Sequence, residues 1–326
     1  MKEKIEQFND LFSKVENEIK KVVVGQDDII RLTIAGIMAG GHILLEGAPG
    51  LGKTILVKSI SDTLGLDFQR IQFTADLMPS DITGTQVITE NEHGKRNFEF
   101  RKGPIFSNIV LADEINRTGP KTQSALLEAM EEKQVTVVGT TYQLPKPFFV
   151  LATQNPIELE GTYPLPEAQL DRFMLKVIVG SPSASELKKI LQRTTGTNTP
   201  KASQVLHPEQ SGAVIIQMRE LVRSVLIAPP VEDVLVGMLS ALNPTSDNAP
   251  EKVIQYVRYG SGPRGAQSLI LIAKVFALLD GRANVSYDDL KKAAIPTLRH
   301  RLILNYQAEA DGITTDNIIN LIKEGN

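Results

Sequence analysis

A glycine-rich segment carries the clearest chemical signal in the chain. It consists of Gly47, Ala48, Pro49, Gly50, Leu51, Gly52, Lys53 and Thr54, which is the pattern G-x-x-x-x-G-K-T. A strand-like run precedes it and a helix-like run follows, as this pattern requires. The glycines let successive backbone N–H groups converge on an anion, and the following helix adds its positive end. Lys53 can then reach the outer phosphates and the Thr54 hydroxyl can ligate Mg²⁺, so the sequence predicts a loop that binds nucleotide phosphates.

Two adjacent carboxylates, Asp113 and Glu114, end the apolar run Ile109–Ala112. In a parallel sheet, the end of this strand faces the phosphate loop. We expect Asp113 to hold Mg²⁺ through its water shell. Glu114 is placed to take a proton from an attacking water. The pair thus separates a metal-bound carboxylate from a free base.

Three further residues could complete such a site. Asn155 follows an apolar run that ends at Thr153, and its amide could orient the water or contact the γ-phosphate. The alternative is an ordinary Asn-Pro turn at a strand end. Arg172 and Arg264 could supply the extra positive charge that phosphoryl transfer needs, or could be ordinary surface residues.

Short apolar runs alternate with helical patterns from Ile43 to Val179. The strand candidates are Ile43–Leu45, Phe68–Phe73, Ile109–Ala112, Phe148–Ala152 and Leu175–Val179. This alternation predicts an α/β fold, a parallel sheet covered by helices on both faces. Ahead of it, an amphipathic helix and a second helix that ends near Gly40 are expected.

The pattern becomes helical after Gly180. Ser183 and Glu186 form a capping box that starts a helix. No convincing strand follows, and the clearest helical segments are Pro208–Val225, Val231–Leu242, Arg264–Leu279 and Tyr287–Leu298. We therefore expect a first domain over residues 1–181 and a helical second domain over residues 182–326.

Two hairpins are expected within the first domain. The strand pairs are Thr85–Thr89 with Phe98–Arg101, around the turn 91–94, and Val135–Val138 with Tyr142–Leu144, around the turn 139–141. The first mixes basic and acidic residues, and the second is largely apolar or hydroxylated. Neither is the dense basic stripe expected of a protein that tracks a phosphate backbone.

The overall composition excludes several classes of protein. The chain has no cysteine, which excludes disulfides and thiolate metal sites. Its net charge of −3 argues against a coat of basic residues for gripping nucleic acid. No apolar run of membrane-spanning length is present, and the charged start Met1–Glu6 lacks the apolar core of a signal peptide. We expect a cytoplasmic protein with no transmembrane segment.

The order and content of these motifs resemble the MoxR family of AAA+ ATPases over nearly the whole chain. The segments that carry the resemblance are Val24–Gln26, the phosphate loop, Asp113–Thr118, Ala125–Glu132, Asn155, Pro166–Phe173, Gly262–Arg264 and Glu309–Thr314. The resemblance implies an AAA+ parallel-sheet, phosphate-loop NTPase core. This core would carry a helix-2 insert and a pre-sensor-1 hairpin, and an all-α lid domain would follow it.

The resemblance also implies a role for each motif residue. Gly25 and Gln26 would lie beside the adenine of ATP, Lys53 and Thr54 would be the Walker A pair, Asp113 and Glu114 the Walker B pair, Asn155 sensor 1, Arg172 the arginine finger of a neighbouring subunit, and Arg264 sensor 2. Whether Arg264 serves its own subunit or the next is open at this point. Asn116 and Arg117 match the extended Walker B motif without an assigned role. Gly262 and Gly265 replace the more usual Ser and Ala, which loosens the start of a helix by up to ~1 kcal/mol and would leave Arg264 less firmly aimed.

The predicted function is that of a ring ATPase, expected to be hexameric, that uses ATP and Mg²⁺ to remodel or mature a protein partner. In the family such partners often contain von Willebrand factor A (VWA) domains. One alternative is a DNA-associated motor, which DNA-stimulated ATPase activity would reveal; the acidic charge and the mixed hairpins disfavour nucleic acid as a partner. The other is a phosphotransferase with a small-molecule acceptor. GTP is disfavoured because the sequence has no Asn-Lys-x-Asp guanine-reading motif.

Overall fold

A five-stranded parallel sheet lies at the centre of the first half of the chain. This computed structural model describes residues 1–90, 96–156, 161–196 and 200–324. The strand order is β2 (Phe68–Gln72), β5 (Ile109–Asp113), β8 (Phe149–Gln154), β1 (Ile43–Glu46) and β9 (Leu175–Ile178). All neighbouring pairs are parallel. The five strands predicted from the apolar runs are confirmed.

Successive residues of each strand point to opposite faces of the sheet, and in the three central strands, β5, β8 and β1, both faces are buried. Ile43 and Leu45 belong to one buried apolar cluster, whereas Leu44 belongs to a second cluster on the other side. The same split separates Leu111 from Val110 in the neighbouring strand. A strand that is covered on both sides is apolar along most of its length, which explains why the central runs are continuous, whereas the edge strand β2 is largely polar and exposed.

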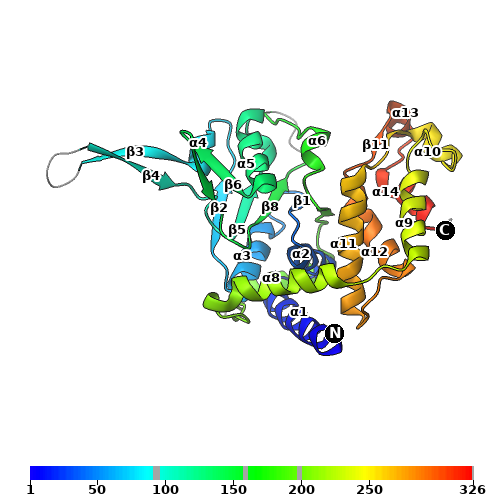
Figure 1. Cartoon of the computed structure of the whole chain (residues 1–326), viewed down its shortest axis with the longest axis horizontal. Coiled ribbons are helices and arrows are strands. Elements are labelled where there is room, and N and C mark those ends of the chain that lie inside the picture. Colours follow the sequence, from blue (N-terminus) through cyan, green and yellow to red (C-terminus); the bar gives the residue numbers. More distant parts are fainter. Residues whose placement is uncertain (91–95, 157–160, 197–199, 325–326) are drawn as a thin grey trace.

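Helices of the first half cover the two faces (Figure 1). The helices α1 (Lys2–Val22), α2 (Asp27–Ala39) and α3 (Lys53–Leu64) contribute to the first cluster. The helices α4 (Pro79–Thr83) and α5 (Pro120–Glu132) contribute to the second. Two short helical segments, η1 (Ile115–Arg117) and α6 (Glu167–Leu170), follow β5 and precede β9, respectively. The loop between β1 and α3 thus follows a strand whose first three residues are buried.

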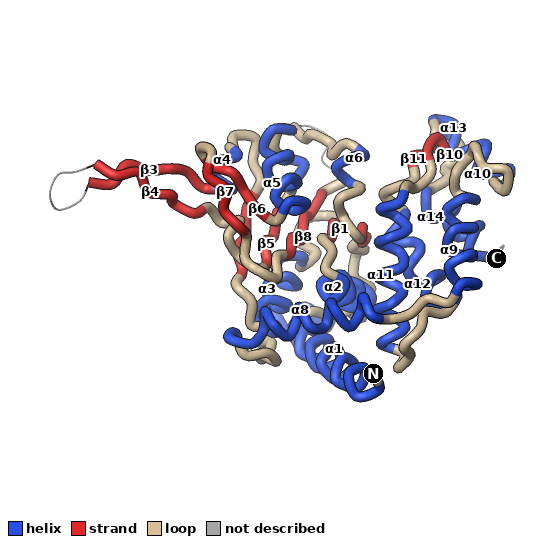
Figure 2. The backbone as a smooth tube through the Cα atoms, in the orientation of Figure 1, coloured by secondary structure: helices blue, strands red, loops and turns tan. Residues whose placement is uncertain are grey.

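Both predicted hairpins are present. The strands β3 (Gly84–Glu90) and β4 (Arg96–Lys102) form a long antiparallel pair that projects from the body of the molecule (Figure 2). The predicted turn at 91–94 lies outside the described residues. The second hairpin comprises β6 (Gln134–Val137) and β7 (Thr140–Gln143). Phe100 stacks on Tyr142 with the ring centroids 4.0 Å apart, which joins the bases of the two hairpins.

The second half of the chain is mainly helical, and most of it forms a lid beside the sheet, whereas residues 208–224 run along the helices of the first half (Figure 1). Its helices are α7 (Ala184–Thr194), α8 (Pro208–Ser224), α9 (Pro229–Ala241), α10 (Glu251–Tyr256), α11 (Pro263–Leu279), α12 (Tyr287–Leu298), α13 (Tyr306–Ala310) and α14 (Thr315–Glu324). The capping box is confirmed, since the Ser183 hydroxyl accepts from the Glu186 N–H and the Glu186 carboxylate accepts from the Ser183 N–H. The lid packs onto the core through the first buried cluster, which extends from the sheet into α11 and α12.

One expectation for this half is wrong. A small antiparallel pair, β10 (Val257–Tyr259) with β11 (Ile303–Leu304), interrupts the helical lid, although no strand was expected after Gly180. These strands are three and two residues long, too short to show a period of two in the sequence. Among the described residues, no helix has both the length and the apolar character needed to cross a bilayer.

Candidate functional site

The phosphate loop is a backbone cradle at the carboxyl end of β1. Gly50 and Gly52 have φ angles of +78° and +79°, a left-handed conformation that other residues adopt only at a cost. A Cβ at either position would meet no heavy atom of the described residues within 4 Å, so the backbone angle rather than crowding demands glycine there. The side chain of Lys53 is buried and its Nζ donates to the Gly47 carbonyl at 2.5 Å. Burial lowers the pKa of Lys53, and the nearby Asp113 and Glu114 oppose that shift.

The two predicted carboxylates lie at the adjacent carboxyl end of β5. Asp113 is only 8% exposed, and Glu114 follows it with a left-handed φ of 57°. One hydroxyl links them, because Thr153 Oγ1 donates to Asp113 Oδ1 at 2.6 Å and accepts from the Glu114 N–H at 2.8 Å. Sequence analysis missed Thr153 as a functional residue. The sheet order could have revealed it, because β8 lies beside β5 with Ala152 opposite Ala112.

Three further polar side chains donate hydrogen bonds to these carboxylates. Arg70, on β2, donates to Asp113 Oδ2 from Nη2 at 2.6 Å and from Nε at 3.1 Å. Gln72, at the end of the same strand, donates to Glu114 Oε2 at 2.9 Å, and Arg117 Nη1 donates to the same oxygen at 2.8 Å. Arg117, which had no assigned role, therefore contacts the candidate base directly. A divalent cation at Asp113 would have to compete with Arg70.

Asn155 lies immediately beyond β8 and is 4% exposed. Asn116 donates from Nδ2 to the Asn155 carbonyl at 3.4 Å, so this second residue without an assigned role supports the backbone of the predicted sensor. The structure thus brings Lys53, Asp113, Glu114 and Asn155 together at the carboxyl end of the sheet, as the sequence predicts.

A cavity of about 290 Å³ adjoins the phosphate loop. Gln26 lines it together with Gly50, Leu51 and Gly52, and Gly25 forms the turn before Gln26 with φ +72°. Gln26 Nε2 donates to the Leu51 carbonyl at 2.9 Å, while its Oε1 is buried without a hydrogen-bond partner among the described residues. Ile55, another lining residue, is 51% exposed. An apolar wall with one unpaired acceptor fits a flat base that carries an amino group, such as adenine.

The residues at the loop also fit a magnesium ion. Within the ranges that the structure describes, no cluster of three or more His, Cys, Asp or Glu side chains could form an all-protein metal site. Mg²⁺ in nucleotide sites instead uses one or two protein ligands together with phosphate oxygens and water. Thr54, in the first turn of α3, and Asp113 are the residues that would hold it.

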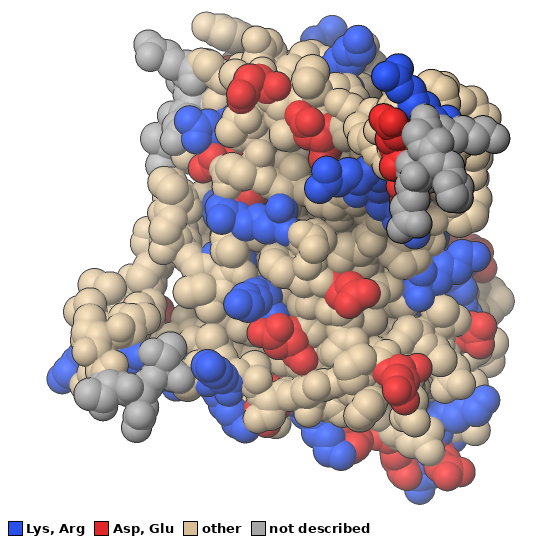
Figure 3. All heavy atoms as spheres, turned by 90° about the vertical axis from the view of Figure 1, so that its left-hand side faces the viewer, with Lys and Arg blue, Asp and Glu red and all other residues tan. Residues whose placement is uncertain are grey.

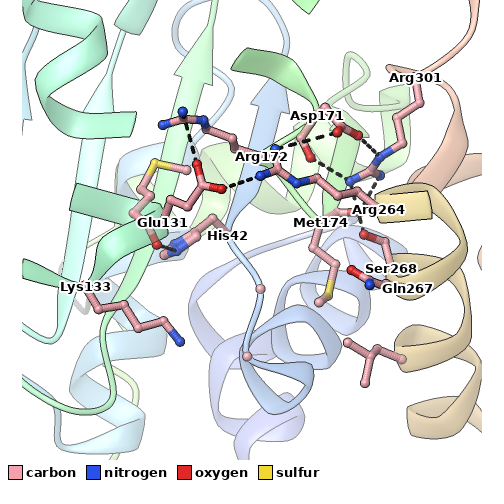
Figure 4. Close-up of a pocket in the computed structure, with 14 residues that line it drawn as sticks. His42, Glu131, Lys133, Asp171, Arg172, Met174, Arg264, Gln267, Ser268 and Arg301 are labelled. Atoms are coloured by element: carbon pink, nitrogen blue, oxygen red, sulfur yellow. Dashed lines mark hydrogen bonds and ion pairs between the residues drawn. The ribbon is translucent and has the colours of Figure 1, made fainter. Parts of the chain in front are cut away.

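The two predicted arginines lie elsewhere. Arg172 and Arg264 line a cavity of about 230 Å³ beside Gly41 and His42, where β1 begins (Figure 4). The phosphate loop begins at Gly47, five to six residues further on and just past the end of β1, so at ~3.3 Å per residue the two places are ~17–20 Å apart along the chain. This span exceeds the length of an arginine side chain. Neither arginine reaches the phosphate loop of its own chain.

Two acidic residues contact the Arg264 side chain, whereas the loosening of the helix start by Gly262 and Gly265 remains a prediction. Arg264 Nη2 pairs with Glu131, and its Nη1 lies 3.7 Å from Asp171 Oδ2. A Cβ at Gly265 would collide with Ser261 Oγ and lie 3.1 Å from Arg301 Cδ, so this glycine permits close packing. Ion pairs set the direction of the Arg264 side chain.

Arg301, a buried residue that sequence analysis missed, links the lid to the segment that carries Arg172. Its side chain is 2% exposed and donates to Asp171 Oδ1 at 2.7 Å and to the Phe173 carbonyl at 2.8 Å. Burial lowers its pKa, and the hydrogen bond to Asp171 counteracts that effect. The segment before β9 is thereby anchored to the turn that follows α12.

The surface at the hairpin end of the molecule carries charges of both signs. On the part of this face that is described, basic and acidic side chains are interspersed rather than gathered into one basic stripe (Figure 3). This distribution gives no electrostatic track for a nucleic-acid backbone.

The fold and the site define a class of protein. A parallel sheet with a phosphate loop after β1, paired carboxylates after β5, a polar amide after β8 and a helical lid is the architecture of an AAA-type ATPase. Family profiles agree with this: the ATPase family associated with various cellular activities (AAA) matches residues 42–175, and the AAA lid domain matches residues 253–322.

The family follows from its relatives. The chain is 40% identical over 305 residues to Chaperone MoxR1 of Mycobacterium tuberculosis. This match covers 94% of the present chain and 79% of the Mycobacterium protein. It is 30% identical to Protein MoxR of Methylorubrum extorquens, over 91% of this chain and 89% of the other. It is also 43% identical to the uncharacterized protein YeaC of Bacillus subtilis, over 96% and 93% of the two chains. The chain belongs to the MoxR family of AAA+ ATPases.

A solved structure shows the same fold. The crystal structure of a candidate ATPase from Cytophaga hutchinsonii, at 2.00 Å resolution, superimposes with a TM-score of 0.90. The two chains are 44% identical, and the match covers 99% of this chain and 96% of the other. The lid therefore takes the same general position relative to the sheet in both proteins.

Proposed function

We propose that this chain hydrolyses ATP as one subunit of a closed ring, a hexamer, in which each nucleotide is cleaved between two subunits. The observation that carries this proposal is the separation of the catalytic groups. Lys53, Asp113 and Glu114 lie at the carboxyl end of the sheet, while Arg172 and Arg264 lie at its amino end. A head-to-tail arrangement brings the amino end of one copy against the carboxyl end of the next, and such heterologous contacts form a ring when the rotation between neighbouring copies closes.

Each residue of the site has a distinct part in the proposed reaction. The loop backbone and Lys53 hold the phosphates, and Gln26 contacts the adenine. Glu114 takes a proton from the attacking water, which Asn155 orients. Thr54 and Asp113 would hold Mg²⁺, which would supply positive charge to the phosphate oxygens. Arg172 and Arg264, both from the adjacent subunit, stabilise the charge that spreads over the transferred group. We thus propose that Arg264 acts in trans, a point that the sequence left open.

Two experiments test the hydrolysis and its division between subunits. We expect Glu114→Gln to bind ATP yet hydrolyse it at least ~10²-fold more slowly, because the base is lost while the loop is intact. We also expect mixtures of Lys53→Ala and Arg172→Ala subunits to regain activity, since some interfaces then combine an intact loop with an intact arginine. Wild-type turnover in Glu114→Gln, or mixtures no more active than either variant alone, would contradict the proposal.

We propose that the ring acts on a protein partner. We expect this partner to contain a VWA domain. The printed name of the Mycobacterium relative, a chaperone, supports a protein client. The interspersed charges at the hairpin end favour a protein over DNA (Figure 3). The test is affinity capture with the Glu114→Gln variant in ATP, with Lys53→Ala as the control that does not hold nucleotide. A client captured only by the former supports the proposal, whereas DNA-stimulated ATPase activity would favour a motor on nucleic acid.

The division of the chain into a nucleotide-binding core of residues 1–181 and a lid of residues 182–326 is also a proposal. Limited proteolysis with nucleotide present tests it: a division at this point predicts preferential cleavage close to residue 181.

A further inference from the structure

Glu131 lies between the two arginines of the amino end and is the residue from which we draw a further inference. It is near the end of α5, where the helix returns to the amino end of the sheet. Its Oε2 pairs with Arg172 Nη2 at 3.1 Å, and its Oε1 pairs with Arg264 Nη2. Figure 4 shows the two guanidinium groups meeting at this one carboxylate, with Arg172 reaching it from one side and Arg264 from the other.

We propose that Glu131 is a positioning residue that holds Arg172 and Arg264 side by side, so that both can reach one phosphate group of the adjoining subunit. The inference rests on the proposed function, in which these arginines act across the subunit interface. It adds a residue that has no part in the proposed reaction itself.

The charges of the arginines make such a residue necessary. Two guanidinium groups that converge on one phosphate repel each other until that phosphate is present. A carboxylate with one oxygen for each cation removes the repulsion and fixes their separation. Each guanidinium has five N–H donors, so the contact with Glu131 leaves others available for a phosphate.

The exposure of the three side chains separates a positioning role from a stabilising one. The side chains of Arg172, Glu131 and Arg264 are 29%, 37% and 45% exposed, respectively. Ion pairs at this exposure contribute little to folding free energy, with a median of ~0–1 kcal/mol. Their geometry is more informative than their energy, because phosphoryl transfer depends on the placement of positive charge.

The two arginines depend on Glu131 to different degrees. Arg264 has a second acidic neighbour, Asp171, which is itself anchored by the buried Arg301 (Figure 4). Within the described ranges, Glu131 is the one acidic side chain that pairs with Arg172. Loss of Glu131 should therefore release Arg172 fully and Arg264 partly.

The experiment uses full-length assembled subunits and measures phosphate release at saturating ATP. We expect Glu131→Ala to lower kcat about 10- to 100-fold, which is less than the ~10³–10⁵-fold effect of an inserted arginine. Glu131→Gln keeps the size of the side chain but offers one acceptor oxygen, and we expect it to be slow as well. Glu132→Ala is the matched control, since Glu132 is the next residue of α5 and is exposed. We expect it to retain wild-type turnover.

Mixed rings distinguish positioning from a general structural defect. A Glu131→Ala subunit keeps its own phosphate loop, and a Lys53→Ala subunit keeps its own arginine pair. In a random equal mixture about one quarter of the interfaces combine the intact parts, so activity should rise toward that fraction of wild type. A mixture of Glu131→Ala with Arg172→Ala lacks any intact pair of arginines and should remain slow.

Three results would overturn the inference. The first is normal turnover in Glu131→Ala or in Glu131→Gln. The second is a slow Glu131→Ala variant that Lys53→Ala does not rescue, although Lys53→Ala rescues Arg172→Ala. This result would support a site shared between subunits but would refute the positioning role of Glu131. The third is failure of Lys53→Ala to rescue Arg172→Ala, which would refute the shared site and the role of Glu131 together.

Discussion

Replacing Thr153 with Val tests how the catalytic carboxylates are held. Valine has nearly the same shape, but it removes the hydroxyl that donates to Asp113 Oδ1 at 2.6 Å and accepts from the Glu114 N–H at 2.8 Å. A hydrogen bond to a charged group contributes ~1.5–3 kcal/mol and a neutral one ~0.5–1.5 kcal/mol. We therefore expect Thr153→Val to lower the free energy of unfolding by about 2–4 kcal/mol. For a chain of 326 residues, the corresponding fall in Tm is roughly 3–6 °C.

The same substitution should slow hydrolysis more than it weakens ATP binding. Glu114 adopts a left-handed φ of 57°, and the bond from its N–H to Thr153 helps to hold it there. A catalytic group that shifts by ~1 Å can lose ~10²-fold in rate, so we expect kcat to fall about 10- to 100-fold. The phosphate loop is unchanged, and the KM for ATP should stay close to that of wild type.

Thr153→Ser is the matched control, because it keeps the hydroxyl and removes only the methyl group. Phosphate release at saturating ATP and thermal unfolding should be measured for both variants. Serine should retain most of the turnover at a cost of ~1 kcal/mol from the lost methyl group. The reasoning is refuted if Thr153→Val and Thr153→Ser turn over ATP at equal rates.

Three more predictions follow from individual contacts. Arg70→Gln should lower the Mg²⁺ concentration for half-maximal ATPase activity ~2- to 5-fold, because a half-exposed ion pair of ~0.5–1 kcal/mol no longer competes for Asp113; an unchanged Mg²⁺ titration would show that Arg70 does not compete. Burial lowers the pKa of His42 to about 4, below an unfolded value of 6.5, so the unfolded chain takes up a proton first as the pH falls through this window. Denaturant unfolding should show about 2 kcal/mol of stability lost between pH 7 and pH 5 from this group, and His42→Gln should have a flatter pH dependence than wild type. Gly52→Ala should weaken nucleotide binding in a fluorescent ATP-analogue titration, since its φ of +79° costs an alanine ~1–2 kcal/mol; equal affinity would mean that the loop tolerates another angle.

The local elements could be predicted from the sequence because short-range physics determines them. The phosphate loop needs glycine at its left-handed positions and a helix start directly after it, and both requirements are visible in Gly47–Thr54. Continuous apolar runs between helical patterns indicated the buried strands, and the capping box at Ser183 located the start of α7. The short strands β10 and β11 were missed because pairing between distant segments, rather than any local pattern, forms them.

The composition of the site depended on which segments the fold brings together. The positions of β2 and β8 on either side of β5 put Arg70 and Thr153 against Asp113, although these residues are 43 and 40 positions away in the chain. Nothing in the local sequence around Arg70 or Thr153 indicates that contact, because it depends on the order of the strands.

The sequence by itself determined that the chain has a nucleotide-binding core, since the residues that contact phosphate lie within one continuous loop. Only the tertiary structure decided where the two arginines lie. Arg172 and Arg264 are 92 residues apart in the printed numbering, yet both pair with Glu131 at the end of the sheet opposite the loop. A sequence pattern reports which charges are present, whereas the crossover connections of a parallel sheet determine at which end each of them emerges.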